Sequence, residues 1–241
     1  MPTPVRSNLP GILIATLLPL TVPAQLANRA PYNKILTTEH VELSVDYASQ
    51  WSVSVVDTDF GGVYAPRWAL SYAGASARRN WPTGSQWSFF SSPGAQVWIL
   101  PQTQDVTRLY LGFSAEDLPG NFFDSYLNSD PRVNRTGRWI TWSLVGLSGP
   151  GDLAVWQTDG FGNPIAWITT KDGISAQDAF YLLEGGHSHV NWGFTQPGLY
   201  FATFQVSARK NGQTLTSPPV TFHFGVEATG VDRTRSGVQT P

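Results

Sequence analysis

The C-terminal third of the chain carries an alternation of apolar and polar residues that restricts it to β-structure. Every second residue between positions 200 and 206 is apolar, and the same period of two returns between positions 220 and 226. Successive side chains of a strand point to opposite faces, so each run predicts a strand with one buried face. The pair Asn211-Gly212 between the runs favours a type I′ hairpin turn, because both residues tolerate a positive φ.

The same alternation occurs near the start of the chain. Val41, Leu43 and Val45 alternate with polar residues, and a second alternating run begins at Trp51 after a short polar turn. Two such runs joined by a turn predict a β-hairpin with one buried face. Further strand candidates with weaker patterns cover residues 67–74, 86–91, 96–100, 108–113, 138–145, 152–157 and 163–169.

Composition agrees with many short strands joined by turns, since the chain has 23 Gly and 18 Pro among 241 residues. Residues 197–200, Pro-Gly-Leu-Tyr, resemble the tyrosine corner of immunoglobulin-like sandwiches. We therefore expect an all-β fold, namely an immunoglobulin-like antiparallel β-sandwich built as two packed β domains, with at most one or two short helices. The best helix candidate is 175–183, which opens with Ser175.

The chain divides into four predicted parts. Residues 1–24 predict a signal peptide, 25–130 an N-terminal β domain, 131–227 a C-terminal immunoglobulin-like β-sandwich domain, and 228–241 a disordered tail. The boundary between the two β domains falls in the polar stretch at 129–135. The tail has little apolar content from which to build a core.

The N-terminal segment is typical of a secretory signal. Arg6 supplies its positive region, residues 9–20 form a short apolar core, and Val22-Pro23-Ala24 resembles a cleavage site. This apolar run is too short for a comfortable membrane span, so we expect none in the mature protein, although an uncleaved anchor is the alternative. We therefore expect an exported protein that is periplasmic, on the cell surface or extracellular. The chain has no cysteine, so its core must hold it together without disulfides.

The charge of the chain argues against one class of partner. The formal net charge is −2, and no basic tract occurs along the sequence. Nucleic-acid binding depends on clustered Lys and Arg that neutralise phosphates. We therefore expect no nucleic-acid partner.

Two of the four histidines, His187 and His189, lie two residues apart in a predicted strand. Side chains at that spacing share one face and are about 6.5–7 Å apart along the backbone. Two imidazoles so placed can bind one metal ion, with Zn–N bonds of about 2.0–2.1 Å. The alternative is that both are polar residues on a solvated strand face.

The remaining histidines receive different interpretations. His40 begins a predicted strand on which Glu42 shares its face, so His40 could complete a three-histidine site with Glu42 as a fourth or outer ligand. The long sequence separation from His187 leaves open that His40 is an ordinary surface residue at a strand edge. His223 lies between Phe222 and Phe224, which predicts a place on the more polar face of its strand.

Ten tryptophans raise the alternative of carbohydrate binding, since aromatic faces stack on sugar rings. Strand positions favour a core role for four of them, Trp51, Trp98, Trp139 and Trp142. Three others lie nearer loops and are candidates for exposure: Trp68, Trp81 and Trp87.

Several segments together resemble a family of exported bacterial proteins, the choice-of-anchor M domain-containing proteins, also called actinobacterial surface-anchored protein domains. The matching segments are 38–43, 97–102, 111–113, 151–156, 161–164, 187–195 (His-Ser-His-Val-Asn-Trp-Gly-Phe-Thr) and 197–200. The resemblance implies an immunoglobulin-like terminal domain in an envelope-attached protein that handles metal beside an uptake transporter. The chain departs from the family at Glu39, where Gly is usual, and at Glu42, where Asp is usual.

The sequence thus predicts an exported, non-enzymatic β-sandwich protein of the bacterial cell envelope that binds a divalent transition metal, zinc first. The predicted ligands are His40, His187, His189 and Glu42. Imidazole ligands suit several metals, so zinc is only the first choice. A metal-uptake transporter or another envelope component is the expected partner.

Two other functions stay open at this point. The first is a surface adhesion or carbohydrate-binding module without metal. The second is a metal-dependent hydrolase, because three protein ligands plus water form a catalytic arrangement, although no general base stands out.

Overall fold

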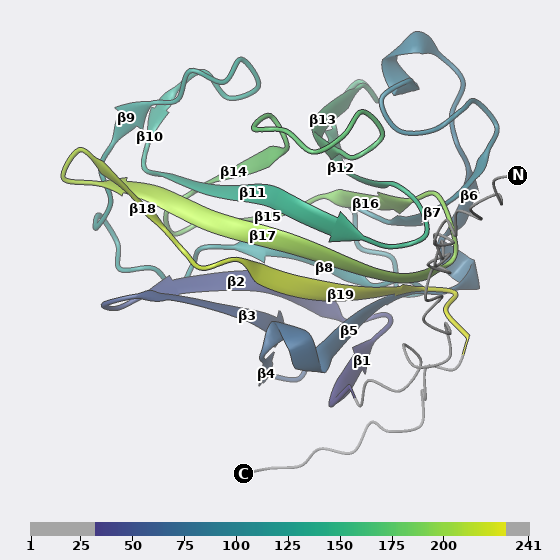
Figure 1. Ribbon diagram of the computed structural model, residues 1–241, viewed down its shortest axis with the longest axis horizontal. Helices are drawn as coiled ribbons and strands as arrows, with labels where there is room; N and C mark the ends of the chain where they lie inside the picture. Colours follow the sequence, from purple (N-terminus) through teal and green to yellow (C-terminus); the bar gives the residue numbers. More distant parts are fainter. Residues whose placement is uncertain (1–31, 230–241) are drawn as a thin grey trace, which may run out of the picture.

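The structure is a computed structural model that describes residues 32–229. It is an all-β sandwich, as the alternation predicted, and its layers of strands are visible in Figure 1. Helical structure within the described range is limited to three short 3₁₀ turns, η2 (Pro66–Trp68), η3 (Ala75–Ala77) and η4 (Ser85–Trp87). The predicted signal peptide over 1–24 lies outside the described residues, and so do residues 230–241 of the tail predicted over 228–241. No helix between residues 32 and 229 is long and apolar enough to cross a membrane.

One layer of the sandwich is a 7-stranded sheet, which we call sheet A. Its strand order is β1-β5-β19-β17-β11-β14, and β18 pairs with β17 beside this path. The strands are β1 (Lys34–Leu36), β5 (Ala69–Ala73), β19 (Val220–Val226), β17 (Gly198–Lys210), β11 (Trp139–Ser148), β14 (Ala179–Leu183) and β18 (Gln213–Thr216).

Two 5-stranded sheets, B and C, face sheet A. Sheet B has the order β15 (His187–His189), β8 (Tyr110–Ser114), β2 (His40–Tyr47), β3 (Trp51–Asp57) and β4 (Gly62–Tyr64). Sheet C has the order β13 (Pro164–Thr169), β12 (Leu153–Thr158), β16 (Asn191–Phe194), β7 (Gln96–Leu100) and β6 (Arg78–Asn80). A small pair is formed by β9 (Tyr126–Leu127) and β10 (Thr136–Gly137).

Aromatic side chains from all three sheets join the layers in one core. Phe113 of sheet B lies 5.0 Å from Trp142 of sheet A and 5.1 Å from Trp192 of sheet C, between ring centroids. Phe204 of sheet A lies 6.2 Å from Trp192. All four are fully buried. Since each such side chain buries about 150–250 Å², this cluster contributes much of the hydrophobic stabilisation that holds the sheets together.

Two local predictions are confirmed. Asn211 and Gly212 have φ values of 52° and 76°, as a type I′ turn requires, and they join β17 to β18. The hydroxyl of Tyr200 donates to the carbonyl oxygen of Gln196 at 2.8 Å and accepts from its backbone N–H at 3.1 Å. This is the geometry of a tyrosine corner, and burial raises the pKa of Tyr200 to about 12.

Most strand pairs are antiparallel, as expected, but two of the sheets are mixed. β2 pairs with β8 in parallel in sheet B, and β5 pairs in parallel with both β1 and β19 in sheet A. The alternation within a strand reports which face is buried but not the direction of its neighbour. The parallel pairs join segments that are distant in sequence, which no hairpin signal could indicate.

The predicted helix over 175–183 is also wrong. Residues 175–178 form a turn, in which the Asp178 carboxylate accepts from the backbone N–H groups of Ser175 at 2.7 Å and Thr169 at 2.8 Å. Residues 179–183 form β14, where Phe180 is buried opposite Trp142 of β11. The polar residues 175–178 therefore favour a turn, and packing on sheet A makes residues 179–183 a strand.

The predicted boundary near residues 129–135 does not separate the sheets. Strands from the two sides pair with one another as β8 with β15, β7 with β16 and β5 with β19. One apolar cluster contains residues from both sides, such as Leu43 and Phe222. The pairing of distant strands therefore unites the two stretches in common sheets.

Tryptophan burial differs from the prediction most clearly at Trp81. Trp81 is 2% exposed and packs edge-on against Phe90 and Trp156 in a second, smaller apolar cluster. Trp68 and Trp87 are half-buried. Of the four expected core residues, Trp98, Trp139 and Trp142 are buried and Trp51 is half-buried.

Candidate metal site

Strand register places the site on one face of sheet B. β8 lies between β2 and β15, with Gly112 opposite Glu42 on one side and opposite His189 on the other. His40 is two residues before Glu42 on β2, so it shares the same face. Gly112 matters because a Cβ there would come within 3.0 Å of the His189 ring. The missing side chain lets the ring approach the sheet.

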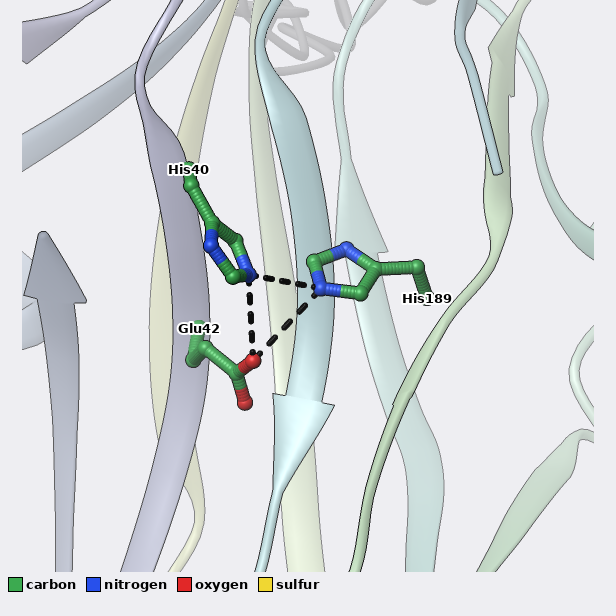
Figure 2. A group of neighbouring side chains, drawn as sticks. All are labelled: His40, Glu42 and His189. Carbon is green, nitrogen blue, oxygen red and sulfur yellow. Dashed lines mark hydrogen bonds and ion pairs between the residues drawn. The ribbon is translucent and has the colours of Figure 1, made fainter. Parts of the chain in front are cut away.

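Three side chains converge at this place, as Figure 2 shows. The Nε2 atoms of His40 and His189 are 2.8 Å apart. Glu42 Oε1 lies 3.4 Å from His40 Nε2 and 3.5 Å from His189 Nε2. Ligand atoms around a tetrahedral ion with bonds of about 2.1 Å are separated by about 3.4 Å. Two of the three separations match that value, and the third would widen on binding.

The three side chains differ in burial. Glu42 is 3% exposed and His189 is 8% exposed, whereas His40 is half-buried. Glu42 Oε2 and His189 Nδ1 are buried atoms with no hydrogen-bond partner. Burying a polar atom without a partner is unfavourable, and a buried carboxylate is especially so. A bound cation would offset part of this unfavourable energy at Glu42.

Tyr110 fixes the position of the imidazoles. Its ring stacks on His189 with centroids 3.5 Å apart and an interplanar angle of 7°, and it lies 5.0 Å from His40. Burial and the nearby Glu42 carboxylate raise the pKa of Tyr110, so the phenol stays neutral. Tyr110 therefore acts as a flat, uncharged wall beside both rings.

Backbone hydrogen bonds hold the two strands that carry the ligands. The N–H of His40 donates to Asp59 Oδ2 at 2.8 Å, and its carbonyl oxygen accepts from the Thr58 backbone N–H at 2.9 Å. On the other side, Gln157 Nε2 donates to the carbonyl oxygen of His189 at 3.1 Å. These bonds hold the backbone of His40 on one side of β8 and the backbone of His189 on the other. None of them uses an imidazole nitrogen.

His187 lies beside this group and outside it. Its Nδ1 is 2.8 Å from Glu116 Oε1, and the ring centroids of His187 and His189 are 6.0 Å apart. The bond to Glu116 raises the pKa of His187, with a further contribution from the charge on Glu42. The predicted pair shares a strand, yet only His189 joins the converging ligand atoms.

His223 has a separate environment on β19 of sheet A. Its Nδ1 lies 3.2 Å from the Tyr32 hydroxyl, and its ring packs edge-on against Phe201 at 4.9 Å. Burial lowers the pKa of His223. This histidine is therefore a natural control for experiments on the other three.

Tyr110, Gly112 and Glu116 are residues of the site region that no sequence pattern indicates. Tyr110 and Gly112 belong to a strand candidate at 108–113, where alternation places both on one face. The local pattern does not show that β8 lies between β2 and β15, which is what brings Tyr110 and Gly112 to the site. Glu116 follows the strand in a polar loop and carries no local signal.

The set of two imidazoles and one carboxylate has a defined chemistry. Neutral imidazole suits Zn, Cu, Ni and Fe, and a carboxylate accompanies it in many sites. Within residues 32–229 this is the one group of three or more His, Cys, Asp or Glu side chains whose ligand atoms converge, within 4.8 Å. The arrangement can therefore hold one divalent transition-metal ion.

Comparison with protein families and with curated proteins identifies no relative of the chain. No model of a protein family matches the chain, and no curated protein matches it. The resemblance to the surface-anchored domain family therefore stays a prediction.

Proposed function

We propose that this protein binds a divalent transition-metal ion, zinc first, through His40, Glu42 and His189, as an exported, non-enzymatic β-sandwich protein of the bacterial cell envelope. The convergence of three ligand atoms around a buried carboxylate is the observation that supports this most. The two histidines are 149 residues apart in sequence, so only the strand pairing brings them together.

The energetics of the group also support a binding role. A sheet face that served stability alone would gain more from apolar residues than from a buried carboxylate with one unpartnered oxygen. Functional sites commonly retain such unfavourable groups. A metal ion supplies the positive charge that Glu42 lacks when the histidines are neutral.

Location and partner belong to the same proposal. The signal-like segment at 1–24 supports export. The resemblance to surface-anchored domains supports attachment to the envelope and a role beside a metal-uptake transporter. Metal binding can be tested independently of both.

Metal content and zinc calorimetry on the purified protein test the proposal. We expect about one zinc ion per chain and loss of binding in the double variant His40→Ala/His189→Ala. His223→Ala is the matched control, since His223 lies on sheet A, and it should bind zinc as the unaltered protein does. Unchanged zinc affinity in the double variant, with the fold intact by circular dichroism, would refute the site.

A second candidate function is carbohydrate binding at a separate place. A cavity of about 400 Å³ is lined in part by Trp87, Pro82, Pro93 and Lys171. A half-buried indole beside polar groups suits a sugar ring. Trp81 is buried and cannot serve in this way. Loss of glycan-array binding in Trp87→Ala, with zinc binding unchanged, would support this function.

A further inference from the structure

The converging group supplies only three protein ligands. A tetrahedral zinc ion takes four ligands and an octahedral ion takes six. Among residues 32–229, no fourth His, Cys, Asp or Glu places a ligand atom within 4.8 Å of all three others. With Glu42 binding through Oε1, the oxygen that lies near both Nε2 atoms, any ion held by these three side chains has at least one position that they do not fill.

His187 is the nearest competitor for that position. Its Nδ1 is engaged by Glu116, which leaves Nε2 available, as in many metal sites with an outer carboxylate. However, the side chains of His187 and Glu116 are 44% and 54% exposed, so this pair lies at the solvent-accessible rim. The three converging ligands, by contrast, include two nearly buried side chains.

Charge indicates what would fill the position. A divalent ion with two neutral imidazoles and one carboxylate has a net charge of about +1. Glu42 and His189 hold that charge where little water reaches, since they are 3% and 8% exposed. A net charge in such surroundings is unfavourable unless an opposite charge accompanies it. An anionic ligand would complete both the coordination and the charge balance.

We propose, building on the proposed function, that the metal in this site keeps an exchangeable coordination position that takes a small anion from solution, for which acetate is the probe. The protein would then hold the metal together with an anionic ligand, and not the bare ion alone. His187 stays at the rim, bound to Glu116, and does not occupy the position.

Cobalt(II) in place of zinc makes the coordination visible, because its d–d absorption depends on ligand number and type. The purified protein is loaded with one equivalent of Co(II) and titrated with acetate, which binds free Co(II) only weakly. We expect a saturable spectral change with acetate in the unaltered protein. The variant His187→Ala should show the same change with an acetate affinity within about threefold, because His187 is not displaced.

The outcomes separate the two proposals. If acetate leaves the unaltered protein's spectrum unchanged but alters that of His187→Ala, His187 fills the position and this inference is wrong. If neither spectrum responds although Co(II) is bound, the coordination is closed and the inference is again wrong. If neither Co(II) nor zinc binds, the proposed function itself fails. His223→Ala, loaded in the same way, controls for the loss of a histidine elsewhere.

Discussion

The two faces of sheet B follow the same alternation and have opposite chemistry. Val41, Leu43 and Val45 of β2 point into the core and are at most 1% exposed. The opposite face of the same strand carries His40 and Glu42, and Glu42 is nearly as deeply buried. One strand thus contributes three alternating valine and leucine residues to the core and His40 and Glu42 to the site.

Burial affects the stability of the fold differently on the two faces. On the core face, apolar side chains meet other apolar side chains, and burial stabilises the fold directly. On the other face, Glu42 Oε2 and His189 Nδ1 are buried without partners, so burial there is unfavourable in the metal-free protein. The polar face is therefore explained better by a ligand than by stability.

The core face should show the largest effect on stability. Phe113→Ala removes a fully buried ring that contacts Trp142 and Trp192, and we expect a loss of about 3–5 kcal/mol in the free energy of unfolding. Urea denaturation measures this loss. The fraction that stays folded should still bind zinc at unchanged stoichiometry, and a loss below about 1 kcal/mol would contradict the central place of Phe113.

The polar face should show the converse pattern. His189→Ala removes a ligand, and we expect zinc affinity to fall at least 100-fold, or about 2.7 kcal/mol. Metal-free stability should fall by only about 1 kcal/mol, because the lost Nε2 contact with His40 and the lost stacking on Tyr110 are partly offset by removal of the unpartnered Nδ1 atom. Competition with a chromogenic chelator measures the affinity, and His223→Ala again provides the matched control.

Glu42→Gln sharpens the comparison by separating binding from stability. Replacing the buried carboxylate with a neutral amide should raise the metal-free free energy of unfolding by about 1 kcal/mol. The same variant should lose most of the zinc-induced increase in melting temperature, because the site lacks its negative ligand. Thermal denaturation with and without zinc tests both parts, and a destabilised metal-free variant would mean that Glu42 has a structural role.

A half-buried histidine on sheet A, His223, gives the smallest expected effect. Burial lowers the folded-state pKa of His223, so the unfolded chain binds the proton more strongly. Its contribution to stability is complete above the unfolded pKa of about 6.5 and is lost as pH falls through the folded-state pKa. Urea denaturation as a function of pH should therefore show a shallower acid-side decline for His223→Gln than for the unaltered protein. Equal slopes would contradict the burial effect.

Part of the fold could be predicted because its signals are local. A period of two specifies a strand and its buried face, and Asn211-Gly212 specifies a turn through backbone conformation alone. Signals that depend on the surroundings were less informative. Residues 179–183 became β14 through packing on β11, and Trp81 was buried through contacts with Phe90 and Trp156.

The candidate site was predictable in its residue types and not in its assembly. The sequence placed His40 and Glu42 on one face of a strand, because their spacing is two. It also favoured His187 and His189 as a pair by the same argument. The structure joins His189 to His40 and Glu42 and leaves His187 with Glu116.

The amino-acid sequence alone therefore determined an all-β chain and the face on which each strand carries its polar residues, because side-chain direction alternates with every residue. Only the tertiary structure decided that β8 lies between β2 and β15 and that Gly112 leaves room between their side chains. The physical reason is that strand partners and register are selected by the packing of the whole core, across separations that local periodicity does not encode.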